Sequence, residues 1–246
     1  MLSALKNHPF AVEAFFDESI VLTFAFPKEQ LQTLIPEALS LDTYKNEWAF
    51  IAVAVVKTRD LRPKGFPKLL GNDFVLIGYR VFVNYINSKG KRFRGLYILK
   101  SETNKTVMQI MGNIFTHYSY TTTDIQVMQK DTLLNINSRQ SDLSIVLETG
   151  HEDVSLPRFS PFADWKEARR FAGPLPFTFT YNARRQEMLI VEGVREDWIP
   201  KPIEVVNQHI PFLKDIGLGD GTLANAFMVN SIPYYWKKGK IEKWNN

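Results

Sequence analysis

Two ionisable side chains near the middle of the sequence could carry out chemistry together. Lys100 and Glu102 come directly after the apolar run Phe93 to Leu99. An amine with a lowered pKa is a nucleophile for carbonyl compounds, and a carboxylate can move a proton. The alternative is an ion pair on the surface at the end of a strand, which contributes little to stability. The sequence favours the surface pair and keeps Lys100 and Glu102 as catalytic candidates.

Arg80 is a candidate for binding an anion. It lies inside the strongly apolar run Phe74 to Ile86. A buried guanidinium must be paired with an acid or directed at an anionic group of a ligand. The alternative is that strand alternation turns Arg80 to solvent, on the face opposite Tyr79 and Val81. The strand pattern leaves both possibilities open.

His117 and Tyr120 form a second polar group after a predicted helix over 106–115. Tyr120 could form a hydrogen bond in a pocket, and His117 could carry a proton or support Tyr120, because the pKa of histidine lies near neutrality. The alternative is that both side chains pack against the end of the helix with their polar tips in water. His117 is therefore both a catalytic and a ligand-binding candidate.

The elements that would position these residues are mostly strands. Strand patterns outnumber helical ones about four to one, and most connections are shorter than the roughly twelve residues that a parallel crossover needs. We predict an α+β fold that is mainly antiparallel β, with a curled or closed sheet and a few packed helices. The whole chain, residues 1–246, is expected to form one domain, because no linker divides it.

The remaining elements are predicted from periodicity and from turn residues. A helix over 160–171 would begin with Ser160 as its N-cap, and the basic tail from Lys237 is expected to be exposed. The segment Arg59 to Asp73 reads as a long loop of the kind that often forms a lid. The other predicted strands cover 20–26, 41–44, 48–58, 125–129, 132–138, 142–147, 177–182, 187–194 and 223–235, and a short helix covers 28–35.

Composition excludes several classes of protein. The net charge is only +4 and the charges are mixed, so we expect no nucleic-acid partner. The chain has no cysteine, which fits a reducing cytoplasm, and it shows neither a signal peptide nor an apolar run long enough to span a membrane. Its four histidines lack a metal-binding spacing, and Gly217 to Gly221 lacks the context of a dinucleotide site. We expect a cytoplasmic protein without metal, cofactor or membrane partner.

Three sequence segments resemble a known family. They are Leu31-Gln-Thr-Leu-Ile-Pro36 with Leu39-Ser-Leu-Asp42, Arg62-Pro63 followed by Phe74 to Val83, and Arg94-Gly-Leu-Tyr-Ile-Leu99 with the following helix up to Tyr120. Together they resemble the bacterial family called domain of unknown function 2071, which is grouped with the acetoacetate decarboxylase-like superfamily. The resemblance covers most of the chain. It implies an antiparallel cone-like barrel that encloses a ligand cavity.

The resemblance also implies that the chemistry of true acetoacetate decarboxylases is missing. In those enzymes a helix with Gly-Arg-Glu leads to Pro-Lys-Lys, and the first of these lysines forms a Schiff base. Here Gly112-Asn113-Ile114 stands in place of Gly-Arg-Glu, and Tyr120 stands at the position of the lysine. A phenol cannot form an imine. The resemblance favours a role for Arg80 in binding a carboxylate or another anionic group. Asn113 joins Arg80, His117 and Tyr120 as a ligand-binding candidate.

Three functional hypotheses follow from the sequence. The first is a protein that binds a small anionic or carbonyl-bearing molecule in a barrel cavity. The second is a decarboxylase-like or lyase-like enzyme that uses Lys100 or Glu102. The third is a structural or partner-binding protein, for which Tyr234-Tyr-Trp236 could form an interface, although a barrel-closing strand explains these aromatics equally well. A homo-oligomer is compatible with all three.

Overall fold

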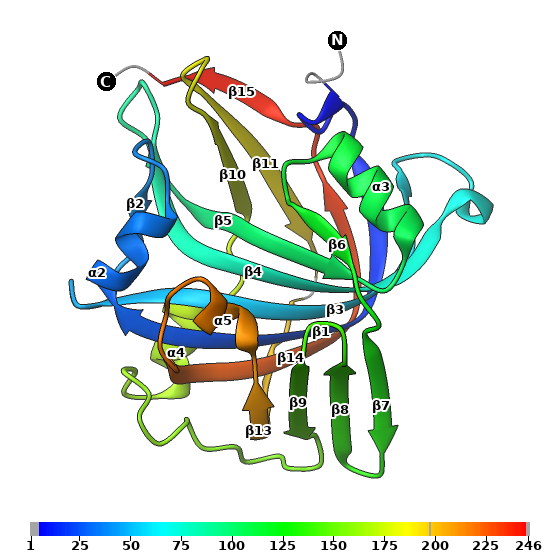
Figure 1. The fold of residues 1–246 in the computed structure, drawn as a ribbon, viewed down its shortest axis with the longest axis vertical. Coiled ribbons are helices and arrows are strands. Elements are labelled where there is room, and N and C mark those ends of the chain that lie inside the picture. Colours follow the sequence, from blue (N-terminus) through cyan, green and yellow to red (C-terminus); the bar gives the residue numbers. More distant parts are fainter. Residues whose placement is uncertain (1–4, 197, 245–246) are drawn as a thin grey trace.

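The computed structural model describes residues 5–196 and 198–244, and its main sheet closes into a ring (Figure 1). The strands of the ring follow the order β14-β1-β3-β4-β5-β10-β11, and β11 pairs back to β14 through Val194 and Tyr235. The ring is therefore a closed, mainly antiparallel barrel, as predicted. Its strands are β1 (Val12–Pro27), β3 (Trp48–Pro63), β4 (Asn72–Ile86), β5 (Arg92–Thr103), β10 (Phe177–Asn182), β11 (Glu187–Arg195) and β14 (Thr222–Trp236).

Short strands and helices surround this ring. Edge strands are β2 (Ser40–Leu41), β6 (Tyr120–Thr122), β12 (Lys201–Pro202) and β15 (Lys240–Lys243). A separate sheet has the order β13 (Glu204–His209), β9 (Leu143–Glu148), β8 (Leu133–Ser138) and β7 (Gln126–Lys130). The α-helices are α2 (Lys28–Leu31), α3 (Thr106–Phe115), α4 (Trp165–Ala172) and α5 (Pro211–Asp215), and 3-10 turns cover Gln32–Leu34 and Lys68–Leu70.

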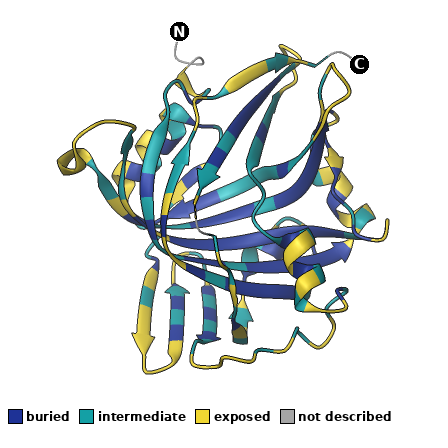
Figure 2. Cartoon of the chain, turned by 180° about the vertical axis from the view of Figure 1, so that it is seen from behind, coloured by how far each residue is buried: buried dark blue, intermediate teal, exposed yellow. Residues whose placement is uncertain are grey.

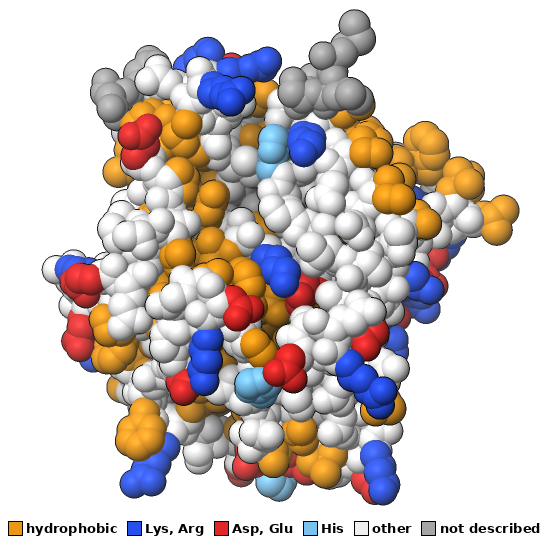
Figure 3. Space-filling view, viewed as in Figure 1, with side chains coloured by type: hydrophobic (Ala, Val, Ile, Leu, Met, Phe, Trp, Pro, Cys, Tyr) orange, Lys and Arg blue, Asp and Glu red, His pale blue; other side chains and the backbone are white. Residues whose placement is uncertain are grey.

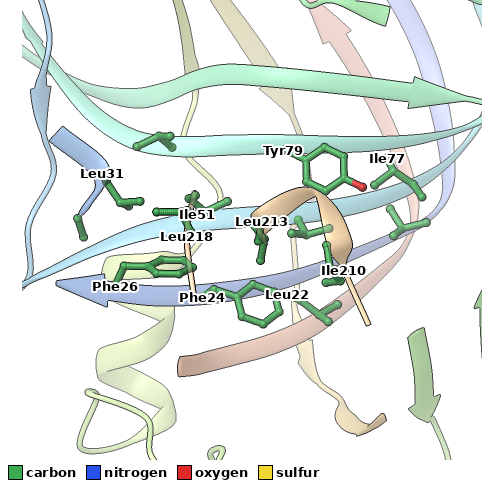
Figure 4. Close-up of a cluster of buried hydrophobic side chains, with 14 of the residues drawn as sticks. Leu22, Phe24, Phe26, Leu31, Ile51, Ile77, Tyr79, Ile210, Leu213 and Leu218 are labelled. Atoms are coloured by element: carbon green, nitrogen blue, oxygen red, sulfur yellow. The ribbon is translucent and has the colours of Figure 1, made fainter. Parts of the chain in front are cut away.

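Side-chain alternation on β3 separates two interiors. Ile51, Val53 and Val55 belong to the main hydrophobic core, which α5 and the residues beside it cover (Figure 4). Ala52 and Ala54 point to the opposite face, where their small side chains leave a cavity unfilled. Seen from behind, the long strands are buried along most of their length, and exposed residues gather in loops and on the small sheet (Figure 2). The alternation of large and small residues on one strand thus creates both the core and the cavity.

Several predicted boundaries need correction. Asp164, not Ser160, is the N-cap of α4, because its side chain accepts a hydrogen bond from the Glu167 amide. The predicted loop over 59–73 is shorter, since β3 continues to Pro63 and β4 begins at Asn72. The basic tail forms β15 and pairs with β11. The helix over 106–115 and the 177–182 hairpin with β11 are confirmed.

Candidate functional site

The cavity lies on the face of the ring opposite the main core and has a volume of about 230 Å³. Strands β1, β3, β4 and β5 contribute to the wall, together with the segment before β1, α3, β14 and the segment after α4. Three lining residues are classed as exposed, namely Leu70, Val107 and Met111. The cavity therefore opens between α3 and the β3–β4 loop, and the segment that the sequence marked as a lid borders this opening.

Arg80 is the most unusual group in the cavity wall. Its guanidinium lies deep in the protein, and the accessible surface it keeps faces the cavity. Within the described residues its Nε has no hydrogen-bond partner, and the titratable groups that act on it are the phenols of Tyr234, Tyr120 and Tyr118. Burial lowers the pKa of Arg80, although a guanidinium still keeps its charge. A buried charge without a counter-charge marks a place for an anion.

Three tyrosines stand around this charge as neutral donors. Burial raises the pKa of Tyr120 to about 12 and also raises the pKa values of Tyr118 and Tyr234. Their hydroxyl groups therefore stay protonated at neutral pH and can donate hydrogen bonds to an oxyanion. The Tyr118 hydroxyl has no hydrogen-bond partner among the described residues. Ser101, which pairs with Tyr120 across β5 and β6, adds another hydroxyl to the lining.

Glycines make room for these side chains. A methyl group on Gly78 would stand 2.8 Å from Arg80 Nε, and one on Gly112 would collide with the Tyr120 ring. A methyl group on Gly193 would collide with the Tyr234 hydroxyl. Three glycines on three separate elements (β4, α3 and β11) thus leave space for the guanidinium and for two of the phenols.

Asn113 fixes the position of Tyr120 but does not line the cavity. Its Oδ1 accepts a hydrogen bond from the Tyr120 amide at 2.9 Å, and its Nδ2 donates to the Tyr120 carbonyl at 2.8 Å. This pair of bonds ties α3 to β6 and holds the Tyr120 backbone. The sequence makes Asn113 a ligand-binding candidate. In the structure its side chain is not part of the cavity wall and is bonded to the Tyr120 backbone.

His117 lies outside the cavity as well. Its Nε2 is 3.2 Å from Asn7 Oδ1, and it borders a separate surface pocket with Arg184 and Arg185. The histidine in the cavity wall is instead His8, whose ring lies 5.3 Å from the Tyr118 ring. No sequence signal pointed to His8, because its position depends on how the N-terminal segment packs against α3 and the β14–β15 connection.

Lys100 and Glu102 lie on the other face of the sheet. Leu99 forms a bulge in β5, so that Lys100 pairs with Tyr79 and Glu102 pairs with Ile77, both in the main core. Lys100 Nζ is 2.7 Å from Glu102 Oε1, and the Tyr79 hydroxyl donates to Glu102 Oε2 at 2.9 Å. The Glu102 side chain is only 1% exposed. The two residues form a partly buried ion pair, in which Glu102 is buried and Lys100 is partly exposed, and neither lines the cavity.

The charge of the lining is one-sided. Among the described residues that form the wall there are three arginines, Arg62, Arg80 and Arg195, and there is no lysine, aspartate or glutamate. Arg62 is paired with Glu13 at 2.7 Å, and Arg195 donates to the Pro174 carbonyl at 2.7 Å. Arg80 alone of the three lacks such a partner within the described chain. The wall therefore attracts anions and offers no amine for imine formation.

His8 should make stability depend on pH. Burial is the main cause that lowers its pKa from 6.5 to about 4. The unfolded chain then takes up a proton before the folded chain does, so stability falls as pH drops from about 6.5 to about 4. The loss is on the order of 3 kcal/mol for this histidine. Urea unfolding at several pH values should show a smaller loss for His8→Gln, whereas the exposed control His151→Gln should behave as wild type.

Other site types find no support in the described parts of the chain. No group of three or more His, Asp or Glu side chains is arranged to hold a metal ion among the residues that the structure describes. No described helix is long and apolar enough to cross a membrane.

The closed ring and its cavity define an acetoacetate decarboxylase-like fold. The acetoacetate decarboxylase-like enzyme of Sphingomonas wittichii RW1 matches with a TM-score of 0.62 at 10% identity, over 96% of this chain and 94% of that one. Acetoacetate decarboxylase of Legionella pneumophila subsp. pneumophila str. Philadelphia 1 matches with 0.61 at 10% identity, over 94% and 86%. The enduracididine biosynthesis enzyme MppR, complexed with pyruvate, matches with 0.54 at 9% identity, over 95% and 90%.

The family is shown by a match over most of the chain. Residues 14–242 match domain of unknown function 2071, which is described as an uncharacterized conserved protein. The chain belongs to this family, as the three sequence segments indicated. No curated protein matches the chain.

Proposed function

We propose that the protein binds a small anionic molecule, and foremost a carboxylate, in the cavity beside Arg80. The observation that carries the proposal is the buried guanidinium, which has no counter-charge among the described residues and lies in a wall whose described residues include no acid. A carboxylate accepts two parallel hydrogen bonds from a guanidinium, which makes arginine the preferred partner for this group. Neutral Tyr118, Tyr120 and Tyr234 can donate to the same oxyanion or to a neighbouring carbonyl.

A carbonyl next to the carboxylate fits this arrangement. MppR, whose fold this chain shares, is described as complexed with pyruvate, a keto acid. The donors around Arg80 come from two parts of the chain: Tyr118 and Tyr120 lie just before and at the start of β6, and Tyr234 lies on β14. Such a spread suits a ligand with two adjacent oxygen-bearing groups better than a lone carboxylate.

The proposed function does not include Schiff-base chemistry. That reaction needs an amine in the cavity, and the described lining contains none. Tyr120, at the position that the resemblance assigns to the lysine, can hold a ligand by a hydrogen bond but cannot form an imine. Lys100, the amine of the enzyme hypothesis, is bound to Glu102 on the opposite face. We further propose that the protein acts in the cytoplasm, in line with its lack of cysteine.

Calorimetry with matched ligands tests this proposal. We expect pyruvate, acetoacetate and propanoate to bind, and propanamide, which has the same shape without the charge, to bind at least tenfold more weakly. Equal affinity for propanoate and propanamide would contradict the role of Arg80. Borohydride treatment of the acetoacetate complex should leave the intact mass unchanged. A reduced adduct would show that an imine forms and would contradict this part of the proposal.

A further inference from the structure

Helix α3 carries an apolar stripe that is partly exposed to solvent. Val107, Ile110, Met111 and Ile114 form an apolar stripe at positions i, i+3, i+4 and i+7, and they are exposed by 58%, 56%, 39% and 39%. Such a stripe ordinarily faces the protein core. Here the inner side of the helix carries Met108, which packs against Phe74, Tyr118 and Tyr120, together with two polar residues. The Gln109 side chain accepts from the Thr122 amide, and Asn113 bonds to Tyr120. The stripe is thus left without cover in the described structure.

A second apolar surface lies across the opening of the cavity. Phe66, Leu69 and Leu70 in the β3–β4 loop are exposed by 53%, 94% and 58%. Hydrophobic side chains gather at the right-hand edge of the molecule, over the outer side of α3 and this loop (Figure 3). We call these seven residues of the loop and α3 the mouth patch. Leu70, Val107 and Met111 belong both to the mouth patch and to the cavity wall, so apolar surface continues from the interior to the outside.

The charges in the segments that carry the mouth patch are all positive. The loop over 63–72 contains Lys64 and Lys68, and the segment over 105–117 contains Lys105, while neither contains an aspartate or a glutamate. Positive charge at a mouth raises the local concentration of anions. A second copy of this chain docked here about a two-fold axis would bring like charges together, which disfavours that occupant.

We infer that the ligand is an anionic amphiphile, a carboxylate with an unbranched hydrocarbon tail. Its head binds at Arg80, and its tail leaves between Leu70 and the α3 stripe and covers the mouth patch. The inference rests on the proposed function and names the class of ligand for the same cavity. The cavity of about 230 Å³ opens beside Leu70, Val107 and Met111. The head and the first part of the tail occupy it, and a longer tail extends onto the patch.

A series of straight-chain carboxylates tests this inference. Calorimetry of propanoate, butanoate, hexanoate, octanoate and decanoate, each below its micelle-forming concentration, should show affinity rising about three- to fourfold for each added methylene. The rise should continue beyond the length that fills the cavity. Decanol, which has the tail without the anionic head, should bind at least tenfold more weakly than decanoate.

Two surface variants separate the tail from the head. Ile110 and Leu69 belong to the mouth patch but do not line the cavity. In the double variant Leu69→Ser with Ile110→Ser, decanoate affinity should fall about tenfold and butanoate affinity should stay unchanged. Met128→Ser is the control, because Met128 is 53% exposed on β7 in the separate sheet. It should leave both affinities unchanged.

The possible failures are distinct. If butanoate binds through Arg80 but affinity stops rising with chain length, the tail inference is overturned and the proposed function stands. If no carboxylate of any length binds, the proposed function itself fails. Light scattering after gel filtration tests whether a second copy of the chain covers the mouth patch instead. If the wild type is a dimer, and if the double variant is a monomer with unchanged decanoate affinity, the mouth patch is an interface between copies and the inference is overturned.

Discussion

The variant Arg80→Met is expected to lose carboxylate binding and to gain stability. Removing one partner of a buried, hydrogen-bonded charge pair costs about 2–5 kcal/mol of binding, so affinity for propanoate should fall at least about 30-fold. The unliganded protein should become more stable by about 1–2 kcal/mol, because methionine fills a similar volume without a buried, uncompensated charge. The gain stays small because water in the cavity can solvate part of the guanidinium.

Weaker ligand binding together with higher stability is the result expected of a residue that serves a ligand site and not the fold. Calorimetry and urea unfolding measure the two quantities, and Arg139→Met is the matched control, since Arg139 is exposed in the turn between β8 and β9. The control should change neither quantity. A destabilised Arg80→Met variant that still binds propanoate would show that Arg80 serves the fold and not the ligand.

The variant Lys100→Met is expected to lose stability and to keep ligand binding. Without the ammonium group, Glu102 would be left as a carboxylate that is 1% exposed, with only the Tyr79 hydroxyl as its side-chain partner. Removing one member of a buried ion pair costs about 3 kcal/mol, at the lower end of the usual range because the Tyr79 hydrogen bond remains. Propanoate affinity should not change, because the pair lies on the opposite face from Arg80.

The reverse deletion supplies the control. In Glu102→Gln the ammonium group of Lys100, whose side chain is 28% exposed, can turn toward water, so the loss should be only about 1–2 kcal/mol. Urea unfolding compares the two variants. If Lys100→Met folded with wild-type stability but lost ligand binding or turnover, the chemistry of the protein would belong to the Lys100 face of the sheet.

Sequence patterns were sufficient for the fold, and they drew attention to Arg80, which lines the cavity. The excess of strand patterns and the short connections predicted a mainly antiparallel, curled or closed sheet, and the charge inside the run Phe74 to Ile86 made Arg80 a candidate. The helix over 106–115 was predicted with its observed bounds. These features depend on local composition and alternation, which a single sequence records directly.

Features that depend on distant contacts could not be predicted in the same way. The Leu99 bulge decides which face Lys100 and Glu102 occupy, and nothing in the alternation of β5 marks it. Tyr234 joins the site because β14 closes the ring against β11. The stripe on α3 predicts burial by periodicity, yet it lies at the cavity opening and is partly exposed, because Met108, Gln109 and Asn113 dock the other side of the helix.

Anomalous diffraction from crystals of the protein grown with 3-bromopropanoate would test the central claim most directly. The account predicts a bromine peak inside the cavity, with the carboxylate about 3 Å from the Arg80 guanidinium. The bromine should lie on the side of Leu70 and Val107, where the cavity opens. A cavity without bromine, in crystals that hold the acid at other surface sites, would contradict the claim that Arg80 is an anion-binding group.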